Sequence, residues 1–160
     1  MRDWKRNTEE ILLPDLPADC QEAIEKHTEA YNLGDILDQP TMVIKIVSNK
    51  LKKGLFSGKP KLVESYVALT PAWLVWTVST DGDPPAVMSA KFAEIIAEDY
   101  LESGHYALIQ DNGFSITGKL TGLVGTEGQQ QSSMFIGLGE EPAAVEFKAS
   151  FIGAIQNSRR

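Results

Sequence analysis

Residues 41–47 read TMVIKIV, and this stretch decides the fold because the chain changes there from helix-forming to β-branched residues. From this point turn residues recur about every ten positions, a spacing typical of antiparallel β structure. The pattern predicts strands near 41–53, 61–70, 73–80, 85–92, 105–110, 113–120 and 131–138. It also predicts a tight hairpin turn at Asn112-Gly113 and a looser turn over 81–85.

A single helix is predicted to follow the last strand. Pro142 suits a first helical turn, and apolar residues then recur at helical spacing. These apolar residues are Ala144, Phe147, Phe151, Ile152 and Ile155. Such a stripe has to pack against other elements, so we expect the C-terminal helix to close one end of the strands.

The N-terminal forty residues follow a different pattern. Pro17 and Asp19 suit a helix start, and Asn32-Leu33-Gly34 suits a stop, so a helix is predicted over about 16–32. Residues 1–14 show no sustained period, and we expect either a mobile arm or a short surface strap there. The chain is therefore divided into an N-terminal arm and helix, 1–40, and a β domain, 41–160, which form one structural unit overall.

The amino-acid sequence of the predicted strands resembles that of a known family. The stretches KGLF at 53–56, KPK at 59–61, VALT at 67–70 and LVW at 74–76 resemble the first three strands of bacterial pleckstrin-homology-like (PH-like) domain proteins. The resemblance spans about residues 41–156. It implies a mainly β, α+β fold, in which a seven-stranded antiparallel barrel or sandwich is capped by a C-terminal helix. It also implies a binding role without catalytic residues. The helix at 16–32 is an addition to this pattern.

The charge balance bears on the class of partner. Fifteen Lys and Arg against 22 Asp and Glu leave a formal charge of −7, which opposes non-specific binding to nucleic acid or to an anionic membrane. We therefore expect a protein partner and no nucleic acid. The single cysteine, Cys20, excludes an internal disulfide and suits a small buried residue on a helix. No apolar stretch has the length of a signal peptide core or a membrane span, so the cytoplasm is the expected compartment.

A lysine cluster is the first candidate binding site. Six of the fifteen basic residues fall within the seventeen positions 45–61, where no carboxylate occurs. They are Lys45, Lys50, Lys52, Lys53, Lys59 and Lys61. In PH-like proteins that bind phosphoinositides, lysines and arginines of the first loop hold the ligand, so the resemblance implies anionic lipid or polyphosphate binding at Lys50, Lys52, Lys53, Lys59 and Lys61. The alternative is a solvated edge whose lysines discourage strand pairing. The cluster lacks arginine, which gives phosphate its bidentate grip.

Two tryptophans are the second candidate. Trp73 and Trp76 are three positions apart on one predicted strand, so they face opposite sides of the sheet. We expect one to be buried and the other to be partly exposed, where it either anchors a protein partner or packs in a second core.

Catalytic and metal-binding patterns are weak. His27 and His105 lie far apart in sequence, and the glycines at 122–128 lack the lysine that completes a phosphate loop. The glycines at 137–139 precede Glu140 and Glu141, whose charges would repel a phosphate. Asp81 and Asp83 read as turn residues rather than calcium ligands. We therefore predict a non-enzymatic module without a cofactor. It binds a protein or peptide in a groove between a strand edge and the C-terminal helix, or on the exposed side of its sheet. Lipid or polyphosphate binding is the alternative.

Overall fold

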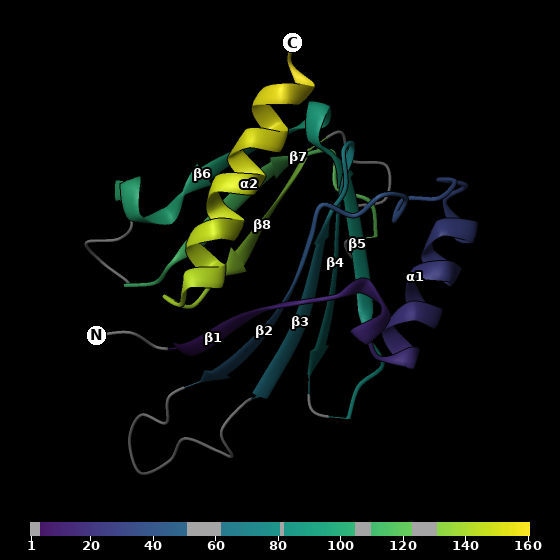
Figure 1. The fold of residues 1–160 in the computed structure, drawn as a ribbon, viewed down its shortest axis with the longest axis horizontal. Coiled ribbons are helices and arrows are strands. Elements are labelled where there is room, and N and C mark those ends of the chain that lie inside the picture. Colours follow the sequence, from purple (N-terminus) through teal and green to yellow (C-terminus); the bar gives the residue numbers. More distant parts are fainter. Residues whose placement is uncertain (1–3, 51–61, 81, 105–109, 123–130) are drawn as a thin grey trace.

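The computed structural model describes residues 4–50, 62–80, 82–104, 110–122 and 131–160 (Figure 1). Its strands are β1 (Trp4–Ile11), β2 (Met42–Lys50), β3 (Leu62–Leu69), β4 (Trp73–Thr80), β5 (Ala86–Lys91), β6 (Ile95–Asp99), β7 (Gly113–Gly118) and β8 (Ser132–Gly137). Its α-helices are α1 (Ala18–Ala30) and α2 (Pro142–Ser158). Short 3-10 turns, η1 (Leu13–Asp15), η2 (Phe92–Glu94) and η3 (Tyr100–Glu102), join some of these elements.

The strands form two antiparallel sheets. The larger sheet has the order β1-β2-β3-β4-β5, and the smaller has the order β6-β7-β8. The prediction of a mainly β, α+β fold that ends in a helix is therefore confirmed. The barrel is not closed, because η2 turns the chain out of β5 and into the second sheet. Within the described residues, the sheets are joined by one isolated bridge, Ser89 with Thr121, rather than by a paired strand.

Most of the predicted strands lie where the sequence placed them, but β6 was not predicted. The expected strand at 105–110 falls almost entirely outside the described residues. The prediction of a hairpin turn at Asn112-Gly113 was wrong, since Gly113 is the first residue of β7 and pairs with Gly137 of β8. The Asn112 side chain instead donates a hydrogen bond to the carbonyl oxygen of Gly139 at 2.6 Å.

The expectation of an arm or strap over residues 1–14 was also wrong. Trp4–Ile11 pairs with β2 along its whole length, from Trp4 opposite Lys50 to Ile11 opposite Val43. The edge of β1 that does not pair with β2 is also hydrogen-bonded, because the Thr8 hydroxyl accepts a hydrogen bond from the Gly139 amide at 2.9 Å. The Thr8 amide donates to the Glu141 carboxylate at 2.7 Å. Strand β1 therefore connects the larger sheet to the start of α2.

The inter-sheet core lies between the two sheets and under α2. Alternate residues of β2, β3, β4 and β5 face it, and the buried stripe of α2 packs into it. Phe151 of α2 lies at its centre, with its ring 4.9 Å from that of Phe114 and 5.8 Å from that of Phe147. The predicted apolar stripe of the C-terminal helix is thus confirmed, with Ala144, Phe147, Phe151 and Ile155 buried and Ile152 partly buried.

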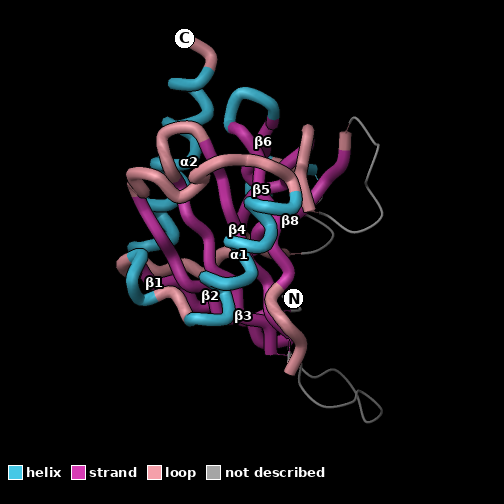
Figure 2. The backbone as a smooth tube through the Cα atoms, turned by 90° about the vertical axis from the view of Figure 1, so that its right-hand side faces the viewer, coloured by secondary structure: helices cyan, strands magenta, loops and turns pink. Residues whose placement is uncertain are grey.

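The opposite face of the larger sheet is covered by α1. Figures 1 and 2 show α1 and α2 on opposite sides of this sheet. Leu16, Cys20 and Ile24 pack against the strand residues of this face to form a second core, the α1 core. The strand residues are Val43, Tyr66, Ala68, Val75 and Val87. The larger sheet is consequently buried on both faces, and the N-terminal region supplies the cover of one of them.

Candidate functional site

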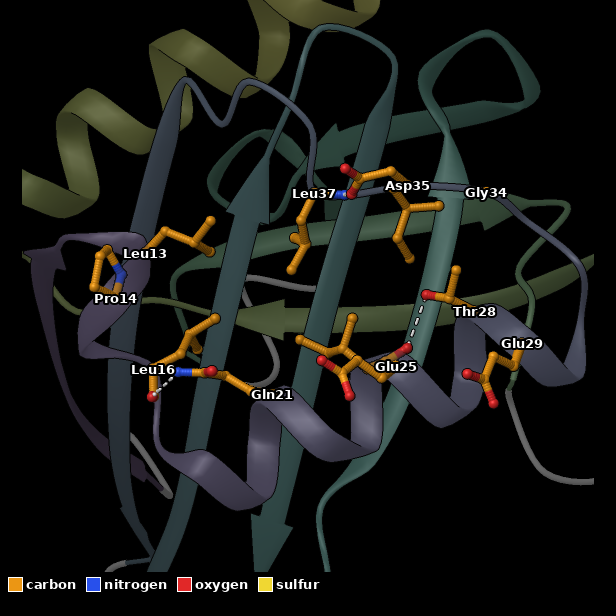
Figure 3. A pocket seen from close by; sticks show the side chains of 12 residues that line it. Leu13, Pro14, Leu16, Gln21, Glu25, Thr28, Glu29, Gly34, Asp35 and Leu37 are labelled. Atoms are coloured by element: carbon orange, nitrogen blue, oxygen red, sulfur yellow. Dashed lines mark hydrogen bonds between the residues drawn. The ribbon is translucent and has the colours of Figure 1, made fainter.

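A groove runs between α1 and the loop that follows it, over the outer face of the larger sheet (Figure 3). Its volume is about 470 Å³. We call it the α1 groove and define it by the residues Leu13, Pro14, Leu16, Gln21, Ile24, Glu25, Thr28, Glu29, Gly34, Asp35, Ile36 and Leu37. The groove is thus built from η1, α1 and the loop over 34–37.

The floor of the α1 groove is apolar. Leu16, Ile24 and Ile36 are buried, while Leu13 and Leu37 are half-buried. Gly34 has a φ of 77°, a left-handed conformation that glycine adopts without strain, and it begins the loop that carries Ile36 back over the sheet. The Asp35 carboxylate accepts a hydrogen bond from the Leu37 amide at 3.2 Å and fixes this loop locally. The floor is therefore shaped by packed or hydrogen-bonded segments.

The rim of the α1 groove is acidic. Gln21, Glu25 and Glu29 follow one another at every fourth position of α1, so they lie in a row along one side of the helix. Gln21 is held by its hydrogen bond to the Leu16 carbonyl oxygen at 2.8 Å. Glu25 and Glu29 are exposed and form no ion pair with any described residue. Asp35 lies on the loop across the groove, with its carboxylate turned toward the Leu37 amide (Figure 3). No lining residue of the groove is basic.

The negative charge of the chain is concentrated in the segment that supplies this groove. Residues 7–40 carry nine carboxylates and one lysine, a formal charge of −8, whereas the whole chain carries −7. The carboxylates belong to Glu9, Glu10, Asp15, Asp19, Glu22, Glu25, Glu29, Asp35 and Asp38, all of them exposed. The rest of the chain is nearly neutral in sum. The α1 groove therefore lies in the acidic region of the molecule.

This arrangement suits a ligand that is both apolar and cationic. Contact between the floor and an apolar ligand removes apolar surface from water, which favours binding by roughly 25 cal/mol for each Å² buried. The carboxylates, being exposed, contribute only about 0–1 kcal/mol for each ion pair, but they fix orientation and disfavour anions. The α1 groove can therefore select a lysine- or arginine-bearing apolar segment over an acidic one.

The lysine cluster lies elsewhere. Lys50 is the exposed last residue of β2 and is opposite Trp4 in the β1–β2 register. Lys52, Lys53, Lys59 and Lys61 lie outside the described residues. Lys50 does not line the α1 groove, so the acidic groove and the described end of the lysine cluster are distinct features.

The two tryptophans face opposite sides of β4, as predicted. Trp76 is 1% exposed and belongs to the inter-sheet core, so its ring is not on the surface. Trp73 is half-buried beside the α1 core, and the Lys91 ammonium lies 5.5 Å from its ring centroid. The structure thus places Trp73 as the partly exposed member of the pair.

His27 and Cys20 are packed on the inner side of α1. The Nε2 atom of His27 lies 2.8 Å from the Ser89 hydroxyl, and burial lowers the pKa of the imidazole below its ordinary value. Burial likewise raises the pKa of the Cys20 thiol, whose sulfur accepts a hydrogen bond from the Thr77 hydroxyl at 3.7 Å. Both side chains are buried and hydrogen-bonded within the protein, as structural residues are. His105 lies outside the described residues.

The sequence predicts a groove between a strand edge and the C-terminal helix, and the structure has a small pocket beside that helix. A pocket of about 340 Å³ lies between η3 and α2, with the exposed side chains of Leu101 and Val145 on its walls. Lys148 of α2 crosses to Asp99 at the end of β6, with an Nζ to Oδ1 distance of 3.0 Å. This ion pair ties α2 to the end of β6.

The α1 groove itself was not predicted. Its lining comes from three short segments, none of which forms a recognisable motif. The signal that could have revealed it is the density of carboxylates in residues 7–40 beside apolar residues such as Leu12 and Leu13. The net charge of −7 describes the whole chain and does not reveal that the carboxylates are concentrated in this segment.

Among the described residues, no three or more histidine, cysteine, aspartate or glutamate side chains are placed to hold a metal ion. No helix in the described part of the chain has the length and apolar character required to cross a bilayer. Comparison with protein-family models, with curated proteins and with solved structures found no match to this chain.

Proposed function

We propose that this protein is a non-enzymatic interaction module that binds a basic, partly apolar segment of a partner protein in the α1 groove. The observation that carries the proposal is the combination of a buried apolar floor with the carboxylates of Glu25, Glu29 and Asp35 on the rim. Lysine and arginine meet both demands, because their long aliphatic stems cover apolar surface while their charged ends stay at the carboxylates.

The dimensions of the groove favour a short segment. A volume of about 470 Å³ lies within the range of roughly 300–1,000 Å³ that is typical of small ligand sites. A few neighbouring side chains fill such a space, whereas a long amphipathic helix needs an extended groove. The partner therefore contributes a loop or terminus in which lysine or arginine alternates with aliphatic residues.

We also propose that the fold is PH-like with an N-terminal addition. Strands β2–β5 form one antiparallel run, β6–β8 form a second, and α2 follows them, which is the order of elements that the resemblance implies. In this reading β1 and α1 are the additions, and the α1 groove is a site that the shared elements alone do not provide.

The rival function is binding of anionic lipid or polyphosphate through Lys50, Lys52, Lys53, Lys59 and Lys61. The exposed carboxylates of residues 7–40 oppose it, because they repel an anionic surface that approaches from their side. The two functions make opposite predictions for the charge of the ligand, so one set of ligands separates them.

The test is a titration with matched peptides. A labelled hexapeptide of alternating lysine and leucine is expected to bind, whereas its glutamate–leucine and lysine–serine counterparts are expected to bind at least about tenfold more weakly. Binding should weaken as salt is raised, since exposed charges are screened. Preference for the glutamate peptide, or sedimentation of the protein with anionic but not neutral liposomes, contradicts the proposal and favours the rival.

A charge-reversal pair locates the site. Glu25→Lys combined with Glu29→Lys should weaken binding of the lysine–leucine peptide by about tenfold or more, because two attractions become repulsions. The matched control is Glu98→Lys combined with Glu146→Lys, which makes the same change of net charge at exposed positions on β6 and α2. Equal losses in the two double variants would show that net charge alone, and not the α1 groove, attracts the peptide.

A further inference from the structure

A second pocket lies where α1 begins, at one end of the larger sheet. Its volume is about 410 Å³, and it is half open to solvent. We call it the α1-start pocket. The start of α1, the first residues of β3, the end of β4 and the turn after β4 line it. None of its lining residues belongs to the α1 groove, so an inference about this pocket does not rest on the function proposed above.

The strand register sets the back and the floor of the α1-start pocket. Glu64 and Tyr66 are two positions apart on β3, so their side chains point to the same face of the sheet, the face that α1 covers. On β4, Ser79 pairs with Glu64 and Thr77 pairs with Tyr66. The Thr77 hydroxyl lies 3.7 Å from the Cys20 sulfur, which places the first turn of α1 beside Tyr66 and Thr77. Glu64 and Ser79 are half-buried and lie in the open part of the pocket.

The α1-start pocket carries three carboxylates. Asp19 comes from α1, Glu64 from β3 and Asp83 from the turn after β4. None of the three forms an ion pair with a described residue, and no lining residue is basic. The lysine on the same face of β2, Lys45, does not line the pocket. The pocket therefore attracts cations and disfavours anions.

The Tyr66 hydroxyl points to a ligand independently of the charges. Tyr66 is 7% exposed, yet its hydroxyl forms no hydrogen bond with a described residue. Buried tyrosine hydroxyls usually find a partner. Among the described residues, the side-chain polar atoms that are both unpaired and sealed from solvent are Trp76 Nε1 and Asn112 Oδ1. The Tyr66 oxygen is unpaired but is not sealed, so it can be reached through the pocket that Tyr66 lines.

The electrostatic surroundings of the phenol agree with this position. Burial raises the pKa of the Tyr66 phenol, and the negative charge of Glu64 raises it further, as expected for an oxygen on the Glu64 side of the ring. The phenol consequently stays protonated at neutral pH. Its oxygen is then a neutral acceptor beside a carboxylate, an arrangement that suits an N–H donor with a positive charge.

The separation of the carboxylates indicates the kind of cation. They come from three different elements, and no three acidic, histidine or cysteine side chains in the described part of the chain are placed to hold a metal ion. Ammonium groups on a flexible chain can reach separated carboxylates, which one small ion cannot. Pro17 and Leu62 on the walls give the methylene groups of such a chain an apolar contact.

We propose that the α1-start pocket binds a short aliphatic diamine or polyamine. One ammonium group donates to the Glu64 carboxylate and to the Tyr66 oxygen, while a second is held by Asp19 and Asp83. The methylene chain between them covers Leu62. The volume of about 410 Å³ lies in the lower part of the range of roughly 300–1,000 Å³ for small-ligand sites, which suits a short chain.

The test compares three four-carbon probes, 1,4-diaminobutane, butylamine and 1,4-butanediol, by titration of ¹⁵N-labelled protein. The diamine should bind about three- to tenfold more tightly than butylamine, because its second ammonium group adds an ion pair. The diol should not bind at concentrations that saturate the protein with diamine. The largest amide shifts should fall on the residues that surround the pocket, Cys20, Glu64, Tyr66, Ser79 and Asp83.

Two variants separate this site from a general attraction of cations to an acidic protein. Tyr66→Phe removes the hydroxyl but keeps the ring and the net charge, and it should weaken diamine binding by about two- to tenfold. Glu64→Gln should weaken it by a similar factor. The matched control is Glu98→Gln, at an exposed position on β6, which should retain the wild-type affinity within about twofold. Unchanged amide signals of β7 show that each variant is folded.

Several outcomes would overturn the proposal. The first is that the diamine and the diol bind alike. The second is that Tyr66→Phe or Glu64→Gln, in folded protein, binds the diamine as tightly as the wild type does. The third is that Glu98→Gln loses as much affinity as Glu64→Gln, or that the largest shifts fall on the α1 groove.

Discussion

Arg6 and Asp111, which are 105 residues apart in the chain, form a bidentate ion pair that joins the first strand to the segment entering β7. The Arg6 Nε atom lies 3.1 Å from Asp111 Oδ1, and Nη2 lies 2.9 Å from Oδ2. Both side chains are largely buried, with exposed fractions of 13% and 16%. The guanidinium also abuts Gly137 so closely that any larger side chain there would overlap it. Because β1 belongs to the larger sheet and Asp111 lies two residues before β7 of the smaller sheet, this pair ties the two sheets together.

Removal of Asp111 should destabilise the fold. Asp111→Ala leaves the Arg6 guanidinium largely buried without its counter-charge, and we expect the free energy of unfolding to fall by about 1–3 kcal/mol. Urea denaturation measures this, with Asp83→Ala as the control because the Asp83 side chain is exposed. Equal midpoints for the two variants would show that the pair contributes nothing to the joining of the sheets.

Truncation of Ile24 should show that α1 is part of the core. Ile24 is 5% exposed and packs in the α1 core, so Ile24→Ala should lower the free energy of unfolding by about 2–4 kcal/mol. Lys26→Ala, two positions away on the exposed side of the same helix, should change it by less than about 0.5 kcal/mol. A small effect of Ile24→Ala, with unchanged unfolding cooperativity, would mean that the sheet is stable without the cover of α1.

The stability of the protein should depend on the protonation of His27. Burial lowers the pKa of its imidazole in the folded state, whereas the unfolded chain has the ordinary value of 6.5. Below that pH the unfolded state binds more protons, so the His27 contribution to stability is complete above pH 6.5 and is lost as the pH falls from 6.5 toward the folded pKa. Thermal unfolding midpoints of the wild type should therefore decline across this window more steeply than those of His27→Gln. Parallel profiles of the two proteins would contradict this expectation.

Regular periodicity explains which elements were predictable from the sequence. Strands β2 to β5 and the helix α2 bury apolar residues at the spacing of their element, so the pattern is visible in the sequence. Strand β1 lacks this signal because the side chains it turns inward include Arg6 and Thr8, whose partners lie more than forty residues away. Strand β6 is only five residues long, and its two isoleucines, Ile95 and Ile96, are adjacent, with Ile95 buried and Ile96 66% exposed. The strand therefore lacks the alternation of apolar and polar residues that would have revealed it.

The site was less predictable than the fold for a similar reason. The α1 groove depends on Ile36 and Leu37 folding back beside α1, and no local pattern specifies how that loop closes. The lysine cluster is visible in the sequence because its residues lie within a short stretch, but four of its five proposed ligand residues lie outside the described residues. The three carboxylates of the rim, Glu25, Glu29 and Asp35, come from α1 and the loop after it, and only the fold brings them together at one groove.

The most direct test of the account is to map where the lysine–leucine hexapeptide binds, by following the backbone amide signals of ¹⁵N-labelled protein during a titration. We predict that the largest shifts fall in residues 21–29 and 34–37, which line the α1 groove, while the amides of β6, β7 and β8 stay in place. Shifts that are largest at Lys45 to Lys50 or on the smaller sheet, or no shifts at millimolar peptide, would contradict the claim that the α1 groove is the binding site.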